Sequence, residues 1–240
     1  MRGALLLCCL AMAAVFVCGC GSIKRFDYPA EEHSAVQFSG KPLYDAEVAV
    51  IPFNDRRENK NNHSTILLYL VPLVPYGWMS YTRPEDYTGY VSIAAYYVLP
   101  NVALAKAAAY NLHKSNLFSK AYFSFSEQGV SADYILHADL KEMSYKGRII
   151  SYGLSFAAPL LWFLGLPEGT VENRFAVEYY LTRRGSRRRL WEFKYDKACD
   201  MLVSPYYNYG RDVDMFPVML NQSMNEALVN LKKNLKSSGK

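Results

Sequence analysis

The chain has 240 residues, and 27 Lys and Arg against 22 Asp and Glu give a formal net charge of +5. The length allows one domain with a sizeable core or two small ones, and the charge excess is mild. Four of the five cysteines lie in the first 20 residues, so the rest of the chain contains a single thiol, Cys199. This count excludes an internal disulfide framework and a metal site built from cysteines.

The first 20 residues have the build of an export signal. A short positive region, Met1-Arg2, precedes an apolar run over residues 4–17 that is too short to span a bilayer comfortably and ends in small residues. The stretch Val17-Cys18-Gly19-Cys20 resembles the lipobox of bacterial lipoproteins, with an aliphatic residue at −3 and Gly at −1 before a cysteine. An ordinary cleaved signal and an uncleaved anchor are the alternatives.

The resemblance implies cleavage before Cys20, with Val17, Cys18 and Gly19 recognised by the signal peptidase, and acylation of Cys20. Two or three acyl chains, at about 0.8 kcal/mol per buried CH₂, would hold the protein on a membrane essentially permanently. Gly21 follows instead of Asp, which resembles the default destination of such proteins, the outer membrane with the domain facing the periplasm. The predicted organisation is a signal peptide over residues 1–19, a lipidated tether over 20–44 and a periplasmic α/β domain over 45–240.

The first half of the domain predicts a strand over residues 47–53 (EVAVIPF), then a polar loop over 54–63. Residues 65–81 are apolar but contain Pro72, Pro75 and Gly77, which predicts an apolar loop or a short helix plus a turn. The pattern over residues 91–118 is helical, with Pro100 in the first turn of its clearest part.

The second half predicts strands over residues 121–125, 132–145, 175–181 and 190–195. Residues 149–167 form a second apolar insertion, and residues 183–189 join the last two strands as a hairpin in which Gly185 supplies a positive φ. A final helix follows Asp214. Its expected buried stripe is Leu220, Met224, Ala227, Leu228, Leu231 and Leu235.

Three short phrases in this order of elements resemble periplasmic lipoprotein domains related to the amino-terminal domain of TolB and to curli-secretion-type and transport-auxiliary lipoproteins. They are residues 48–53 (VAVIPF), 112–118 (LHKSNLF) and 131–136 (SADYIL). The resemblance implies an α/β sandwich without catalytic machinery, acting as a membrane-tethered accessory or assembly subunit. The expected fold is a single α/β sandwich of two or three layers. It has a mixed sheet of about five strands, a long central helix, a C-terminal helix and two apolar insertions.

Motifs for catalysis are missing from the sequence. It has no G-x-S-x-G, H-E-x-x-H, P-loop or G-x-G-x-x-G pattern. His33, His63, His113 and His137 are far apart, which disfavours a zinc site. We therefore expect a protein that is not an enzyme and has no cofactor or metal.

The predicted hairpin connection carries five arginines within seven residues: Arg183, Arg184, Arg187, Arg188 and Arg189. This local positive field would attract phosphates, and the polyanions of the periplasm are lipid headgroups, lipopolysaccharide cores and acidic glycans, with no nucleic acid. The hypothesis is contact with an anionic surface. The alternative is a solvated tip that discourages edge pairing.

The two apolar insertions place large apolar side chains where composition predicts polar loops. Candidates for a partner or membrane patch are Leu70, Val71, Leu73, Trp78, Leu160, Leu161, Trp162 and Phe163. One interpretation packs the insertions on each other as a separate subcore. Another exposes them to a partner or to the membrane interface, with Tyr76, Trp78, Tyr81 and Trp162 at headgroup depth. A third, that residues 149–167 span a membrane, is disfavoured by Pro159 and two glycines.

These observations predict an outer-membrane lipoprotein that works by binding, as an accessory or structural subunit of an envelope assembly or transport system. Its partners would be the membrane, through acylated Cys20, and a protein or a second copy of itself. The alternative function is a periplasmic carrier of a lipid or another apolar small molecule, held in a pocket between sheet and helices.

Overall fold

The computed structural model describes residues 23–25, 35–60, 65–86, 88–89, 94–212 and 214–238. The strands of the main sheet are β2 (Tyr44–Val50), β3 (Asn54–Asp55), β4 (Tyr76–Tyr81), β7 (Phe118–Phe123), β8 (Tyr134–Ile150), β9 (Gly169–Arg183) and β10 (Arg189–Val203). Their order is β10-β9-β8-β2-β7, and β3 and β4 also pair with β8. A small second sheet has the order β1-β6-β5, formed by β1 (Ile23–Arg25), β5 (Thr88–Gly89) and β6 (Ala94–Tyr97).

Strand β8 is the centre of the main sheet. One edge pairs antiparallel with β9, and the other edge pairs in turn with β2 and β3, both parallel, and with β4, antiparallel. The register shifts between Leu140 and Glu142, which is a bulge of one residue. Because an extra residue reverses the alternation, Leu140, Met143 and Tyr145 are all buried in the core.

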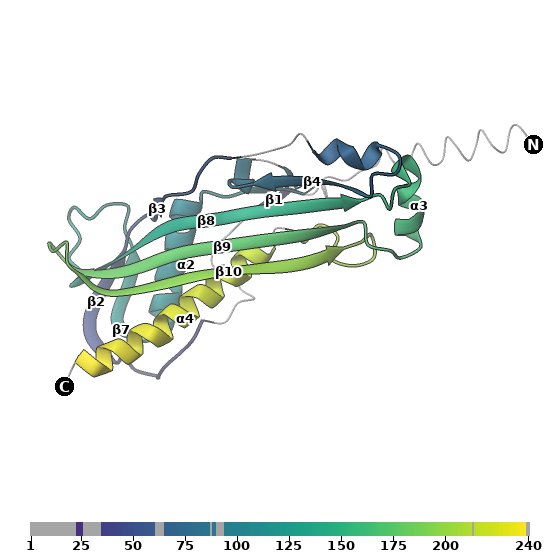
Figure 1. Ribbon diagram of the computed structural model, residues 1–240. Helices are drawn as coiled ribbons and strands as arrows, with labels where there is room; N and C mark the ends of the chain where they lie inside the picture. Colours follow the sequence, from purple (N-terminus) through teal and green to yellow (C-terminus); the bar gives the residue numbers. More distant parts are fainter. Residues whose placement is uncertain are drawn as a thin grey trace, which may run out of the picture.

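Two long helices, α2 (Pro100–Lys114) and α4 (Met215–Ser238), cover one face of this sheet (Figure 1). The short helices are η1 (Ile66–Leu70), η2 (Pro84–Asp86), η3 (Ser155–Ala157) and α3 (Ala158–Phe163). Helix α2 begins at Pro100, which suits a first turn without a donor, and the chain turns away where Asn116 adopts φ 53°. The expected α/β fold is confirmed, and the sandwich has two layers.

The core lies between the sheet and these helices. Leu220, Met224, Ala227, Leu228 and Leu231 of α4 are buried as expected, and Leu235 packs at the margin. The space left between α4 and the sheet has a volume of about 10 Å³, which is too small for any ligand. This space beside α4 therefore has no room for the ligand of the alternative carrier function.

Two predicted elements are wrong in part. The helix expected over residues 91–118 is shorter, because Ala94–Tyr97 form β6 and Phe118 already begins β7. The loop or short helix expected over residues 65–81 contains η1 but ends in strand β4. Pro72 and Pro75 prevent a continuous helix, and β4 begins directly after Pro75. The alternation of inward and outward residues in β4 could not be recognised from the sequence, because the outward Tyr76 and Trp78 are as apolar as the inward residues.

Strands β9 and β10 extend beyond the ranges predicted for them at both ends, and β8 extends beyond its predicted range at the C-terminal end only. They run over residues 134–150, 169–183 and 189–203, whereas the expected ranges were 132–145, 175–181 and 190–195. The added parts of these strands include charged side chains, which form ion pairs with neighbouring strands on the open face of the sheet. Arg174, for example, donates two hydrogen bonds to Asp196 at 3.0 and 2.9 Å. Because these pairs form only across strands, the sequence pattern by itself resembles polar loops.

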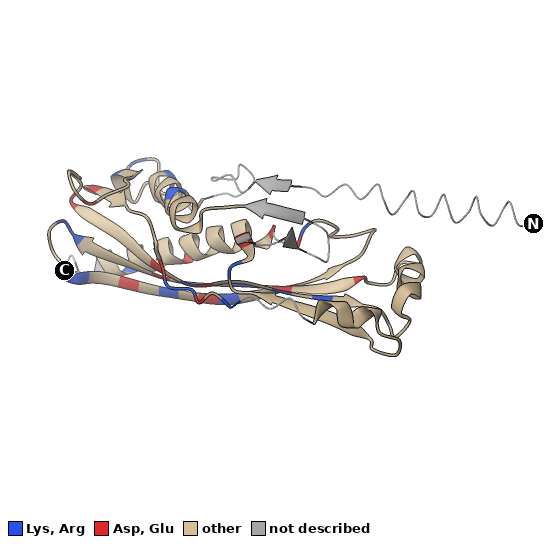
Figure 2. Cartoon of the chain, turned by 90° about the horizontal axis from the view of Figure 1, so that it is seen from above, with Lys and Arg blue, Asp and Glu red and all other residues tan. Residues whose placement is uncertain are grey.

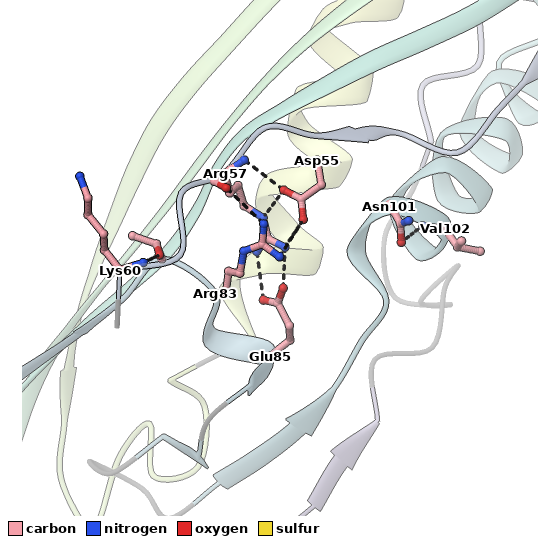
Figure 3. Close-up of polar contacts among 8 residues, drawn as sticks. Asp55, Arg57, Lys60, Arg83, Glu85, Asn101 and Val102 are labelled. Carbon is pink, nitrogen blue, oxygen red and sulfur yellow. Dashed lines mark hydrogen bonds and ion pairs between the residues drawn. The ribbon is translucent and has the colours of Figure 1, made fainter. Parts of the chain in front are cut away.

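The buried side chain of Arg57 connects the two ends of the excursion, the segment over residues 58–82 that contains η1 and β4 (Figure 3). Arg57 donates hydrogen bonds of 3.0 Å from Nε and Nη2 to Asp55, and of 3.0 Å from Nη1 to Glu85. Arg83 Nη2 donates to the Arg57 carbonyl at 3.2 Å. Burial lowers the pKa of Arg57, but the hydrogen bonds to Glu85 and Asp55 outweigh it and raise this pKa. The cluster joins residues 55–57 to residues 83–85.

Candidate binding surfaces

The two apolar insertions come together at one end of the long strands. Leu73 N donates a hydrogen bond to the Gly153 carbonyl at 2.9 Å, and Ser151 N donates to the Pro75 carbonyl at 2.8 Å. Ser155 Oγ also donates to the Leu70 carbonyl. Figure 1 shows helix α3 at this end of the molecule and the turn between β9 and β10 at the other end.

Most large side chains of the insertions remain exposed. Leu73, Phe156 and Leu164 are the extreme cases, with 89, 80 and 78% of their surface accessible. We call the group the distal surface. It comprises Leu67, Leu68, Val71, Leu73, Tyr76, Trp78, Leu154, Phe156, Leu160, Phe163, Leu164 and Leu166. The insertions thus meet through their backbones, whereas most of their large side chains stay exposed and do not form a closed subcore.

Four of the side chains expected in the patch are less exposed than predicted. Leu70, Leu161 and Trp162 are half-buried, and Trp162 Nε1 donates a hydrogen bond of 2.9 Å to the Ile150 carbonyl. Tyr81 is in the core, stacked on Tyr145 with ring centroids 5.9 Å apart. Val71, Leu73, Trp78, Leu160 and Phe163 are exposed as expected. The error at Tyr81 follows from the unrecognised strand β4, whose alternation turns this ring inward.

Charge is missing from the distal surface. Residues 65–77 and 151–167 contain no Asp, Glu, Lys or Arg. Figure 2 shows the contrast with the sheet, along which basic and acidic residues follow one another up to the edge of this uncharged end. Lys146 and Arg148 on β8 are the cations that precede residues 151–167, and Arg148 lies over the Tyr76 ring with Cζ 5.6 Å from its centroid. Large exposed apolar patches mark interaction sites in many proteins, which makes this end a candidate binding surface.

A tyrosine loop adjoins the distal surface and was not recognised as part of a site from the sequence. Tyr206, Tyr207 and Tyr209 are exposed, and the Tyr206 hydroxyl donates a hydrogen bond of 2.6 Å to the Phe163 carbonyl. The cluster of tyrosines over residues 206–209 was the available signal, because Tyr is suited to wet interfaces with its apolar body and polar tip.

Gly77 is expected to be indispensable for the close packing of β4 against η1. A Cβ built at this position would lie 2.0 Å from the Ile66 carbonyl oxygen, so β4 and η1 could not keep their separation. We expect Gly77→Ala to lower the free energy of unfolding by about 2 kcal/mol, the usual cost of overpacking a rigid site. Gly40→Ala is the matched control, since nothing lies within 4 Å of a Cβ there. Equal urea midpoints for the two variants would contradict this expectation.

An open groove runs from the distal surface along the uncovered face of the sheet. It has a volume of about 810 Å³. The outward-facing residues along it are Tyr76, Trp78, Ser80, Lys146, Arg148, Thr170, Glu172, Asp200 and Leu202. The groove is walled on one side by the Tyr76 and Trp78 rings, whose centroids are 6.0 Å apart. It is open to solvent, unlike the enclosed pocket expected of a carrier.

Two buried carboxyl groups lie between the distal surface and the core. Glu168 follows the second insertion and is 7% exposed, and Asp212 is completely buried. The Tyr145 hydroxyl donates to Asp212 Oδ2 at 3.2 Å, whereas Glu168 Oε1 has no hydrogen-bond partner among the described residues. Burial, and secondarily the charge of Asp212, raises the pKa of Glu168 to about 7. Sequence reasoning missed this pair, because nothing local marks a lone Glu after an apolar run as buried.

The arginine-rich turn is at the opposite end of the sheet, and its five arginines differ in their contacts. Gly185 adopts φ 73°, as expected of a hairpin connection. Arg189 Nη1 donates to Glu178 and Glu192 at 2.7 and 2.8 Å, and Arg184 Nη1 donates to the Val130 carbonyl at 3.3 Å. All five side chains are at least partly exposed to solvent.

Comparisons with known proteins bear on the fold. No family model matches the chain, and no curated protein matches its sequence. Among solved structures, protein XCC0632 from Xanthomonas campestris, of family DUF330, is 12% identical with a TM-score of 0.53, covering 91% of this chain and 99% of that one. This chain shares the fold of XCC0632. At such low identity, the likeness concerns the fold and not the activity.

Two further solved structures resemble the chain more weakly than XCC0632 does. A putative neuraminyllactose-binding hemagglutinin homolog from Helicobacter pylori is 11% identical with a TM-score of 0.42, covering 85% of this chain and 92% of that one. The hypothetical protein CT253 from Chlamydia trachomatis is 12% identical with a TM-score of 0.33, covering 78% and 95%.

Some of the predicted site residues lie outside the described part of the chain. They are Val17, Cys18, Gly19 and Cys20 of the export signal, together with His33 and His63. Of the other histidines, His113 is exposed on α2 and His137 is half-buried on β8. Within the described ranges, no three His, Cys, Asp or Glu side chains are grouped to hold a metal, and no helix has the length and apolar character needed to cross a membrane.

Proposed function

We propose that the chain is a lipid-anchored binding protein of the outer membrane, facing the periplasm, and that its distal surface rests in the bilayer interface. In this role it works without catalysis, as an accessory or structural subunit of an envelope assembly or transport system. The observation that carries the proposal is the gathering of exposed, uncharged apolar side chains at one end of the molecule.

The order of side chains along this end supports a bilayer as the occupant. The most exposed residues, Leu73, Phe156 and Leu164, are purely apolar. Tyr76 and Trp78 lie on the adjoining strand, and Arg148 lies over the Tyr76 ring on the side of the sheet. The apolar tip is followed by aromatic rings and then by cations. This order matches the layers of a membrane, which change from hydrocarbon through the interface to the phosphate groups.

The predicted anchor adds a second attachment to the membrane. Cys20 lies three residues before β1 (Ile23–Arg25), which pairs with β6 in the small sheet. Because three extended residues span roughly 10 Å, the acyl chains would hold the membrane close to this small sheet. The acyl chains would supply permanence, and the distal surface would supply orientation.

The experiment separates the distal surface from the anchor. The mature chain with Cys20→Ala is mixed with phosphatidylcholine vesicles, and flotation measures the bound fraction. We expect binding without acyl chains, and a loss of at least tenfold in partitioning for the triple variant Leu73→Ser, Phe156→Ser, Leu164→Ser, because each buried side chain contributes about 1.5–3 kcal/mol. The matched control replaces three exposed apolar residues elsewhere, Leu99, Phe125 and Leu190, with Ser.

Two results would overturn the bilayer as occupant. One is equal flotation of the distal variant and the control variant. The other is an unacylated chain that ignores vesicles but forms oligomers in sedimentation experiments, with the triple distal substitution restoring the monomer. That second result would assign the same surface to another copy of the chain.

A further inference from the structure

A second groove lies on the open face of the sheet, at the end opposite the distal surface. It has a volume of about 470 Å³ and is formed by strands β8, β9 and β10 and the turn between the last two. We call it the hairpin groove. Its lining residues are Glu127, Ile135, His137, Tyr180, Thr182, Arg183, Gly185, Ser186, Arg187 and Arg189.

The floor of the hairpin groove is a fixed stack of side chains from three strands. The His137 and Tyr180 rings are parallel, with centroids 4.8 Å apart, and the Arg189 Cζ lies 4.1 Å from the Tyr180 centroid. His137 Nε2 is 3.0 Å from Thr182 Oγ1, so the imidazole is held by a hydrogen bond as well as by stacking. Because these side chains are already held in place, ligand binding does not have to include the entropic cost of ordering them.

The charges around this floor are unevenly compensated. Arg189 is neutralised by Glu178 and Glu192, whereas Arg183 and Arg187 form no ion pair within the described part of the chain. The opposing carboxylate is Glu127, whose Oε1 is 3.6 Å from His137 Nδ1. Three guanidinium groups therefore line a groove that contains one carboxylate, and those of Arg183 and Arg187 have no ion-pair partner among the described residues.

We infer that the hairpin groove binds a phosphate group carried by a small molecule or a lipid headgroup. Guanidinium groups match phosphate oxygens with paired donors, which favours arginine where phosphate is recognised. The hydroxyl groups of Thr182 and Ser186 add neutral donors at the same site. A merely solvated hairpin tip does not require the stacked floor or a groove of this size.

The source of the phosphate is restricted by the length of the sheet, a step that rests on the proposed function. Strand β9 has 15 residues between the distal end and the turn, which corresponds to roughly 50 Å. Electrostatic attraction to headgroups is screened beyond about 8 Å at physiological ionic strength. The arginines therefore cannot contact the bilayer in which the distal surface rests. The ligand must be soluble or be presented by a second surface.

The test uses the mature chain with Cys20→Ala and follows the ring signals of His137 by NMR during titration with glycerol phosphate. A short-chain phosphatidic acid below its micelle concentration forms the lipid arm. We expect saturable shifts and at least a tenfold weaker affinity for the double variant Arg183→Gln, Arg187→Gln. The control variant Arg211→Gln, Lys233→Gln removes the same charge from exposed positions outside the groove and should leave the affinity unchanged.

Three outcomes would contradict the hairpin groove as a phosphate site. The shifts could fail to saturate, sodium sulfate at equal ionic strength could reproduce them in full, or the control variant could weaken them as much as the groove variant does. Repeating the titration in the triple distal variant keeps this result independent of the proposed function. Saturable binding by the lipid arm alone would identify a headgroup as the source, and binding in both arms would identify the phosphate itself.

Discussion

Replacing Arg57 with Met is expected to lower the free energy of unfolding by about 3–5 kcal/mol, which is the usual cost of removing one partner from a buried ion pair. The Arg57 side chain is 1% exposed, and its partners Asp55 and Glu85 keep 24 and 10% of theirs. Met has a similar length and no charge, so the substitution leaves Glu85 as an uncompensated carboxylate in a confined site. The loss arises mainly from that stranded charge.

A matched ion pair in the same part of the chain provides the control for Arg57. Lys60 and Glu58 form an ion pair whose side chains are mostly exposed. Lys60→Met should therefore change the free energy of unfolding by less than about 1 kcal/mol, because exposed pairs are screened and mobile. Chemical unfolding followed by circular dichroism measures both. A Lys60→Met variant as unstable as Arg57→Met would show that the cluster is no stronger than a surface pair.

The same variant should affect the distal surface. Arg57, Asp55 and Glu85 close the base of the excursion that supplies η1 and β4. If this closure positions the first insertion, Arg57→Met should also weaken vesicle flotation of the unacylated chain at temperatures where the core is still folded. Unchanged flotation at those temperatures would mean that pairing of β4 with β8 is sufficient by itself.

Glu168 should make the protein less stable as the pH rises from about 4.5 to about 7. Its pKa is about 7 in the folded chain and near 4.5 when unfolded, so the folded state binds more protons between these values. Stability is then greatest below the unfolded value and falls as the pH rises from 4.5 to 7. A shift of this size corresponds to about 3 kcal/mol at 1.4 kcal/mol per pKa unit.

The Glu168→Gln variant isolates this contribution. Gln has the same shape without the titrating proton, so the decrease in unfolding free energy between pH 5 and pH 8 should be smaller by about 2.5 kcal/mol in the variant. Glu172→Gln, four residues along β9 and paired with Lys146, should retain the decrease of the native chain. An unaltered pH dependence in Glu168→Gln would place the titration elsewhere. Comparing the differences between pH values cancels the cost of burying the amide.

The periodicity of the strands and helices predicted the fold class, but not the extent of the sheet. The buried runs around Val48 and Leu136 and the stripe of α4 follow from local alternation, and they were placed within a few residues. Strand β4 was missed because its two faces differ in burial but not in polarity. Tyr76 and Trp78 are exposed, whereas Met79 and Tyr81 are in the core. Hydrophobicity cannot distinguish these faces, because the distinction depends on pairing with β8.

The sequence indicated which residue types form the candidate binding surfaces, but not the three-dimensional shape of these surfaces. The sequence placed Leu73, Trp78, Leu160 and Phe163 in apolar insertions and concentrated the arginines in one turn. It did not indicate that His137 and Tyr180 form the floor beneath those arginines, because they belong to two different strands. It also gave no sign that Glu168 and Asp212 share a buried site.

The sequence by itself determined the α/β class, the helix faces, the arginine-rich turn and the uncharged character of residues 65–77 and 151–167, because each depends on neighbours along the chain. The tertiary structure decided that these two segments meet, that their side chains stay exposed, and that they lie at the far end of β9 from the arginines. Those features depend on the register of β8 with its neighbours. Register is set by contacts between residues far apart in sequence, which local patterns do not specify.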